Sequence, residues 1–185
     1  MDYNNMMIST YIIGELGTEF DCCPEFDLHY VMAQDRWKNF YNIVGQACRQ
    51  GEDDAVVICY EGHHFTKDYL PAVLFDKIIR SAKLGTHILI GGCSSFSNLV
   101  PVEEGLFWVD NFEGANFYVV FKHAFQSILE VSPAIDESLE RVLSHLLPNK
   151  LLLSPFISWV GVEGHSDKQL KLYNHVINKY QMIAS

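Results

Sequence analysis

The sequence predicts an α/β sandwich with a mostly parallel central sheet. Short apolar runs alternate with segments of helical periodicity, which is the pattern of strand–helix–strand units. The run Val56–Tyr60 is apolar throughout, as expected of a strand that is buried on both faces. The 185 residues are 49% hydrophobic and include twelve Phe, nine Tyr and three Trp, which is enough apolar material for a substantial core.

The first part of the chain predicts two strands and a helix. We expect strands at Thr10–Ile13 and Leu28–Met32, joined by a glycine-containing loop over 14–24. A helix begins after Asp35 and ends at Gly51, because apolar residues recur between them with the spacing of an amphipathic helix. These residues are Trp37, Phe40, Tyr41, Val44, Ala47 and Cys48.

The middle of the chain continues the alternation. Thr66 is a suitable N-cap for a helix that runs through about Ala82 and stops at Gly85. The pair Gly91-Gly92 ends a buried strand. The expected strands are Ala55–Tyr60, His87–Ile90, Phe107–Val109 and Phe117–Phe121, and a helix over Lys122–Leu129 follows the last of them.

Two further helices and a strand complete the expected fold. Ser132-Pro133 has the pattern of a helix start, with a capping serine and a proline in the first turn, and this helix would end near Leu147. Leu151–Leu153 is a short strand, and Ser166 caps a final helix. No internal repeat or linker interrupts the chain, so residues 1–185 are expected to form a single domain.

Composition excludes several classes of protein. A net charge of -10 without a basic stripe argues against nucleic-acid binding. Five cysteines, odd in number and without a Cys-x-x-Cys pair, indicate reduced thiols. No secretory signal and no apolar run of about 18 residues are visible, so no transmembrane segment is expected. We expect a cytoplasmic protein, and peripheral association with the inner membrane stays open.

Candidate site residues follow the buried strand Ala55–Tyr60. Ligands of open α/β sheets bind beyond the carboxyl ends of parallel strands, where Glu61 and His63 are expected. These two side chains, with phosphate oxygens and water, could hold Mn²⁺ or Mg²⁺. His64 could reach a phosphate or face solvent. The alternative is an ordinary turn at Glu61-Gly62 with surface histidines.

Two other segments are candidates for the same cleft. Gly91-Gly92 would allow a ligand to approach the backbone closely. Asp136, Glu137 and Glu140 would lie in the first two turns of the helix that starts at Ser132. A carboxylate that faces the cleft would be a general base, whereas the helix dipole alone also favours acids at these positions.

The motif Val57–Thr66 resembles the Ile-Ile-Cys-Glu-Asp-Asp-His-x-Phe-Thr signature of bacterial glycosyltransferases of the family-25-like, lipopolysaccharide-biosynthesis type. Further segments resemble this family in the same order along the chain, from about Phe26 onward. They are Leu84–Gly92, Val100–Val102, Phe107–Asp110, Asn116–Phe121, Glu140–Ser144, Leu151–Ser158 and Gly164–Asp167.

The resemblance implies a GT-A-like nucleotide-diphospho-sugar transferase sandwich. In such a site a divalent cation, here on Glu61 and His63, stabilises the leaving diphosphate. A carboxylate across the cleft, Glu140 or Glu137, deprotonates the acceptor hydroxyl of a glycan or a lipid-linked acceptor. The positions that match the donor-binding segments are Tyr60, Glu61, Gly91, Gly92 and Asp110.

The chain departs from the family pattern in both donor-binding elements. Tyr60-Glu61-Gly62 replaces three consecutive carboxylates, so any Mn²⁺ or Mg²⁺ would be bound weakly or not at all. The segment Gly14–Glu19 lacks the Arg residues that the family has near the nucleotide. Three hypotheses follow: a glycosyltransferase, a non-catalytic relative that binds a nucleotide sugar, glycan or protein partner, and a metal-dependent hydrolase that uses Glu61, His63 and His64.

Overall fold

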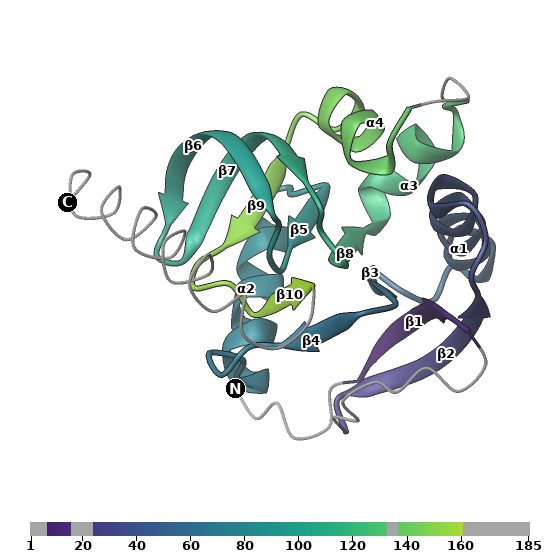
Figure 1. The fold of residues 1–185 in the computed structure, drawn as a ribbon, viewed down its shortest axis with the longest axis horizontal. Coiled ribbons are helices and arrows are strands. Elements are labelled where there is room, and N and C mark those ends of the chain that lie inside the picture. Colours follow the sequence, from purple (N-terminus) through teal and green to yellow (C-terminus); the bar gives the residue numbers. More distant parts are fainter. Residues whose placement is uncertain (1–6, 16–23, 133–136, 161–185) are drawn as a thin grey trace.

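The computed structural model describes residues 7–15, 24–132 and 137–160, and the statements on structure concern these residues. The strands are β1 (Ile8–Gly14), β2 (Phe26–Met32), β3 (Ala55–Tyr60), β4 (His63–Phe65), β5 (Ile88–Ile90), β6 (Ser95–Glu103), β7 (Leu106–Glu113), β8 (Phe117–Phe121), β9 (Lys150–Leu153) and β10 (Ser158–Val160). Eight of them form a central sheet in the order β2-β1-β3-β8-β5-β9-β7-β6, and β10 pairs with β4 in a two-stranded sheet (Figure 1). The helices are α1 (Arg36–Gln50), α2 (Pro71–Lys83), α3 (Lys122–Leu129) and α4 (Leu139–Leu146).

The central sheet is mixed, so the expectation of a mostly parallel sheet holds only in part. Strand β1 is parallel to β2 and β3, and β5 is parallel to β9. Strands β8 and β7 run opposite to the others, because β8 is antiparallel to both β3 and β5, and β7 is antiparallel to both β9 and β6. The β6–β7 hairpin causes this inversion, since it returns the chain to the carboxyl ends of the parallel strands before β8 begins.

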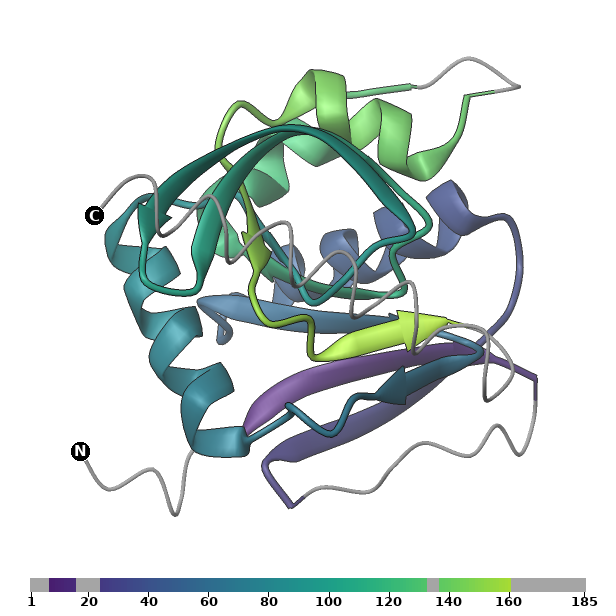
Figure 2. The ribbon, with the colours of Figure 1, turned by 60° about the vertical axis from the view of Figure 1, so that its left-hand side comes forward.

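Helices cover both faces of the sheet, which explains the fully apolar strands. Helices α1, α3 and α4 pack on one face and α2 packs on the other, as the two views of Figures 1 and 2 show. Side chains of β3 and β8 enter both apolar clusters, so Val56–Tyr60 and Phe117–Phe121 are buried along their whole length. The helices within the described residues are too short or too polar to cross a bilayer.

Helix α1 begins and ends where the sequence predicts. The Asp35 carboxylate accepts a hydrogen bond from the Lys38 backbone N–H at 2.9 Å, which caps the first turn. Gly51 ends the helix with φ of 71°, a left-handed conformation that glycine adopts without strain. Of the predicted apolar stripe Phe40, Val44 and Ala47 are buried, Trp37 and Tyr41 are half-buried, and Cys48 is exposed.

Helix α2 begins later than predicted, at Pro71 instead of just after Thr66. Proline suits the first helical position because it lacks the N–H that would be left unpaired there, and it keeps the preceding Leu70 extended. The Thr66 hydroxyl accepts a hydrogen bond from the Asp68 N–H at 3.2 Å and donates one to the Phe156 carbonyl at 2.7 Å. The residues 63–65, predicted to be a loop, form strand β4.

Helix α4 also begins later than the Ser132-Pro133 pattern predicts. Its N-cap is Ser138, whose hydroxyl accepts a hydrogen bond from the Arg141 N–H at 3.3 Å, and the apolar stripe of the helix starts at Leu139. Ser132 and Glu137 therefore lie outside the helix. Asp136 and the helix expected after Ser166 lie outside the described residues.

A segment of the chain, residues 154–160, crosses the carboxyl end of β5, and we call it the strap. Strand β10 in the strap pairs with β4, and the Ile157 N–H donates to the Gly91 carbonyl at 2.9 Å. A Cβ on Gly92 would lie far inside van der Waals distance of the Ser158 carbonyl oxygen. The two glycines were predicted to let a ligand approach the backbone closely; in the structure the strap of the chain itself occupies this position.

The two ends of the central sheet are edge strands of different character. Strand β6 carries exposed Val100 and Val102 on either side of Pro101, and its register with β7 shifts between Pro101 and Glu103. Strand β2 at the other end exposes Tyr30 and Met32.

We predict that Gly92→Ala lowers the free energy of unfolding by about 2 kcal/mol or more, because the Ser158 backbone would have to move. The matched control is Gly45→Ala inside α1, where the added Cβ meets Leu129 at an ordinary 3.5 Å. We expect this control to be neutral or to stabilise by up to about 1 kcal/mol. Urea denaturation of both variants checks the prediction, and equal effects would contradict it.

Candidate functional site

The candidate site lies at the edge of the sheet where β1, β3 and β5 have their carboxyl ends. Strand β8 begins at the same edge, because it is antiparallel to β3 and β5. The strand order reverses here. Strand β2, which follows β1 in the sequence, lies on one side of β1, and β3, which follows α1, lies on the other side. Such reversals open a crevice between the two connections and are the usual ligand sites of open α/β sheets.

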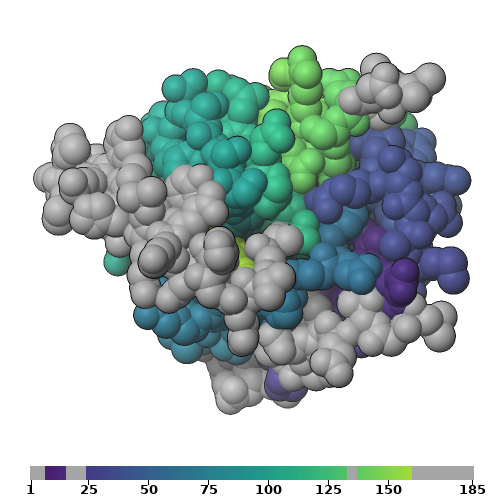
Figure 3. Space-filling model, in the orientation of Figure 1, coloured from purple at the N-terminus to yellow at the C-terminus, as the bar shows by residue number. Residues whose placement is uncertain are grey.

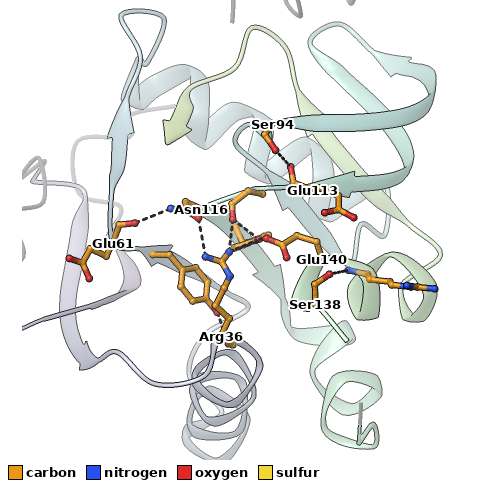
Figure 4. A network of polar contacts seen from close by, with 11 residues as sticks. Arg36, Glu61, Ser94, Glu113, Asn116, Ser138 and Glu140 are labelled. Carbon is orange, nitrogen blue, oxygen red and sulfur yellow. Dashed lines mark hydrogen bonds and ion pairs between the residues drawn. The ribbon is translucent and has the colours of Figure 1, made fainter. Parts of the chain in front are cut away.

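A connected set of polar side chains occupies this edge, and we call it the Arg36 network. The Arg36 guanidinium, from the first turn of α1, donates to Glu140 Oε1 at 3.0 Å and to the Ala115 carbonyl at 2.8 Å through Nη2, and to Asn116 Oδ1 at 3.1 Å through Nη1 (Figure 4). The Tyr118 hydroxyl lies 3.2 Å from Glu140 Oε1. The members are Arg36, Tyr60, Ala115, Asn116, Tyr118 and Glu140.

The network is joined to the predicted motif through Tyr60 and Asn116. The Tyr60 ring packs under the Arg36 guanidinium, with 3.9 Å from Cζ to the ring centre, and its hydroxyl donates to the Arg36 carbonyl at 2.8 Å. The Asn116 amide donates to the Glu61 carbonyl at 2.9 Å. The end of β3 is therefore held by hydrogen bonds to both α1 and the start of β8.

Charge in the network is compensated locally. Burial opposes the charge of Arg36, but Tyr118 and Glu140 outweigh this effect and raise the pKa of the guanidinium. Burial raises the pKa values of the Tyr60 and Tyr118 hydroxyls, so both are neutral donors. The Glu140 side chain is 8% exposed and that of Arg36 is 39% exposed, so the cation is the member of the pair that faces solvent.

Glu61 and His63, the predicted metal ligands, differ in their surroundings. Glu61 is exposed, and Figure 4 shows its carboxylate directed away from Arg36. His63 is buried beside Phe117, with Nδ1 2.8 Å from the Ser158 hydroxyl. No cluster of three His, Cys, Asp or Glu side chains suited to a metal occurs in the described part of the chain. A hard divalent cation prefers several oxygen ligands, so Glu61 and His63 alone do not fit one.

The residues predicted for nucleotide-sugar binding occupy three different places. Tyr60 and Glu61 adjoin the Arg36 network. Gly91 and Gly92 are buried beneath the strap. Asp110 lies in the β6–β7 hairpin, where its carboxylate accepts a hydrogen bond from the Asn98 amide at 3.1 Å.

The two predicted catalytic carboxylates are separated as well. Glu140 is buried in the Arg36 network, whereas Glu137 lies before the N-cap of α4 and pairs with exposed Arg141 at 4.0 Å and His145 at 3.7 Å. In Figure 3 the atoms of α1 and α4 lie side by side at the surface, and an ion pair between Arg36 and Glu140 joins the two helices. His64, which the hydrolase hypothesis needs, is exposed and packs against Trp159, whereas its neighbour His63 is buried.

Sequence reasoning missed Arg36, Asn116 and Tyr118. Tyr118 lies in the predicted strand Phe117–Phe121 and Asn116 directly precedes it, and neither was assigned a role in the site. A signal for Arg36 was present: a cation in the first turn of a helix is disfavoured by the helix dipole, so an arginine there suggests a partner elsewhere in the fold.

No protein-family model and no curated protein matches the sequence. Among solved structures, A197 from STIV matches with a TM-score of 0.55 and 9% identity, over 85% of this chain and 87% of that one. Apo-UDP-glucose pyrophosphorylase matches with a TM-score of 0.48 and 12% identity, over 84% of this chain, which spans 65% of that one. HddC from Yersinia pseudotuberculosis, complexed with GMP-PN, matches with a TM-score of 0.47 and 12% identity, over 89% of this chain and 97% of that one. At this identity, the likeness to A197 is one of fold alone.

We predict that His63 makes the protein acid-sensitive. Burial, with a smaller contribution from His64, lowers the pKa of His63 from 6.5 to about 3 in the folded chain. Between these values the unfolded chain binds the extra proton, so stability is lost as the pH falls below about 6.5. At pH 4.5 the loss from this group is about 2–3 kcal/mol relative to pH 7.

Urea denaturation at the two pH values, on the wild type and His63→Gln, measures this contribution. We expect His63→Gln to lose less stability on acidification than the wild type, whereas the exposed neighbour variant His64→Gln should keep most of the wild-type pH dependence. An identical pH dependence in the wild type and His63→Gln would refute the assignment.

Proposed function

We propose that the chain is a glycosyltransferase-like protein of GT-A type that binds a nucleotide sugar at the Arg36 network. The observation that carries this proposal is the position of the network, at the carboxyl ends of β1 and β3 where the strand order reverses. The motif Val57–Thr66, which resembles the donor-binding segment of bacterial glycosyltransferases, passes through the same place. Topology and motif therefore support the same location independently.

The chemistry of the edge suits such a donor. A nucleotide sugar presents a diphosphate, which needs a positively charged partner, and hydroxyl groups, which donate well to a carboxylate. Arg36 offers a positively charged side chain that is 39% exposed, and Glu61 offers an exposed carboxylate at the same edge, directed away from Arg36.

Transfer would require a carboxylate to take the proton of the acceptor hydroxyl as this oxygen attacks the anomeric carbon and the nucleoside diphosphate leaves. Of the two predicted bases, Glu140 is the better candidate, because it belongs to the network, whereas Glu137 pairs with Arg141 and His145 outside it. The acceptor proposed from the resemblance is a glycan or a lipid-linked sugar.

A second candidate function is a non-catalytic relative that binds a nucleotide sugar, a glycan or a protein partner. One observation favours it: Glu140 Oε1 already accepts from Arg36 and lies close to the Tyr118 hydroxyl, and the side chain is only 8% exposed. A carboxylate held in this way is well suited to fix Arg36 in place and less suited to collect a proton from an acceptor.

We predict that a nucleotide sugar raises the melting temperature of the protein, since a ligand that binds only the folded state stabilises it by mass action. A panel of UDP- and GDP-sugars, each with EDTA or with Mn²⁺, is the measurement. Concentrations of about 100 times Kd should add about 2.7 kcal/mol to the free energy of unfolding. A panel without any shift, in both metal conditions, would argue against both candidate functions as nucleotide-sugar binders.

We predict that Glu140→Gln abolishes sugar transfer while Glu137→Gln leaves it close to the wild-type rate. The physical reason is that a neutral amide cannot accept the acceptor proton, whereas Glu137 lies outside the network. Release of nucleoside diphosphate with a glycan acceptor measures transfer, and the thermal shift with donor shows that the variants still bind. Equal loss in both variants would remove Glu140 as the base, and donor binding without transfer in the wild type would favour the non-catalytic relative.

A further inference from the structure

The proposed donor site contains a positively charged side chain, Arg36. A diphosphate at the ends of β1 and β3 needs neutralising charge, but Glu61 and His63 do not fit a divalent metal, since one is exposed and the other is buried against Ser158. Arg36 is the cation of the network at this edge, and its side chain is 39% exposed. The resemblance assigns the positive charge of the donor site to a metal ion. Here Arg36, which lies outside the motif Val57–Thr66, supplies a positive charge at the same edge.

We propose that Arg36 binds the diphosphate of the donor and that donor binding is independent of a divalent metal. This inference rests on the proposed function and deepens it, because it names the group that recognises the ligand's charge. A guanidinium donates charge-assisted hydrogen bonds to phosphate oxygens, and a metal-free site can use these in place of cation coordination.

The guanidinium is held in a fixed position before any ligand arrives. Asn116, the Ala115 carbonyl and Glu140 fix its two terminal nitrogens, and the Tyr60 ring supports one face. Among the described residues Nη1 donates only to Asn116, so it keeps one N–H for a ligand, whereas the Nε atom is buried and faces no solvent. Because the side chain is already ordered, binding would cost little of the conformational entropy that a mobile arginine loses.

Glu140 sets the strength of this interaction. Its carboxylate lies behind the guanidinium and shares Nη2, so it both orients Arg36 and competes with an incoming anion for its charge. Replacing Glu140 with glutamine keeps an oxygen that can accept from Arg36 but removes the negative charge. The affinity for a diphosphate should therefore rise in Glu140→Gln, in the same variant that is expected to lose transfer.

The experiment measures equilibrium binding of UDP, GDP and the corresponding nucleosides by titration calorimetry, with EDTA and with Mn²⁺. The proteins are the wild type, Arg36→Gln, Arg36→Lys and Glu140→Gln. The matched control is Arg80→Gln, since Arg80 also forms ion pairs, with Asp76 and Glu103, but lies on α2 outside the network. Melting temperatures without ligand show that each variant is folded.

The following results are expected together. Wild-type binding of the nucleoside diphosphate is the same with EDTA and Mn²⁺. Arg36→Gln weakens it about 10- to 100-fold, the range for losing a hydrogen bond to a charged group, and Arg36→Lys weakens it less. Glu140→Gln binds as tightly as the wild type or more tightly. Arg80→Gln is unchanged, and nucleoside binding does not depend on residue 36.

Distinct results would overturn the inference. Binding that requires Mn²⁺, or that survives Arg36→Gln, removes Arg36 as the diphosphate ligand but leaves the proposed nucleotide-sugar site standing. Weaker binding by Glu140→Gln would likewise remove Arg36 as the diphosphate ligand. This variant therefore tests the inference even if Arg36→Gln fails to fold. No binding of any nucleotide by the wild type, in either metal condition, defeats both the inference and the proposed function.

Discussion

Strand β8 joins the two parts of the central sheet. It is hydrogen-bonded to β3 on one side and β5 on the other, and all five of its residues are buried. Because it is antiparallel to both neighbours, its first residues lie at the carboxyl ends of β3 and β5. That single inversion brings Ala115 and Asn116 to the edge where Arg36 needs acceptors, so the site depends on the direction of this strand.

The ion pair between Arg36 and Glu140 is a costly way to join α1 to α4. Removing charges from water is unfavourable, and an apolar pair of similar size would often stabilise a fold as well or better. Here the terminal nitrogens of Arg36 are hydrogen-bonded to Glu140, Asn116 and the Ala115 carbonyl, and the arginine is the more exposed member of the pair. A contact that served only to pack two helices would not need an exposed charge, and this difference is what makes Arg36 a candidate for recognition.

Local signals predicted the elements whose ends depend on their own residues, and failed where distant residues decide. Helix α1 has its cap residue Asp35 and its terminal Gly51 within the segment, so both ends could be predicted. Thr66 has an equally good capping side chain, but its hydroxyl and its N–H both donate to the strap, to the carbonyls of Phe156 and Ile157 some ninety residues away, and α2 begins only at Pro71. The Arg36 network has the same property, since its members come from α1, β3, β8 and α4, and no periodicity or spacing relates them.

The outer strand of the β6–β7 hairpin has a consequence for how the molecule behaves at high concentration. An edge strand presents unpaired backbone groups, and a further strand from another chain can add to it. Towards the end of β6, Pro101 has no N–H to offer, and the register shifts beside it, although Val100 and Val102 are exposed on either side. Both features disfavour the addition of a strand from another chain at this part of the edge.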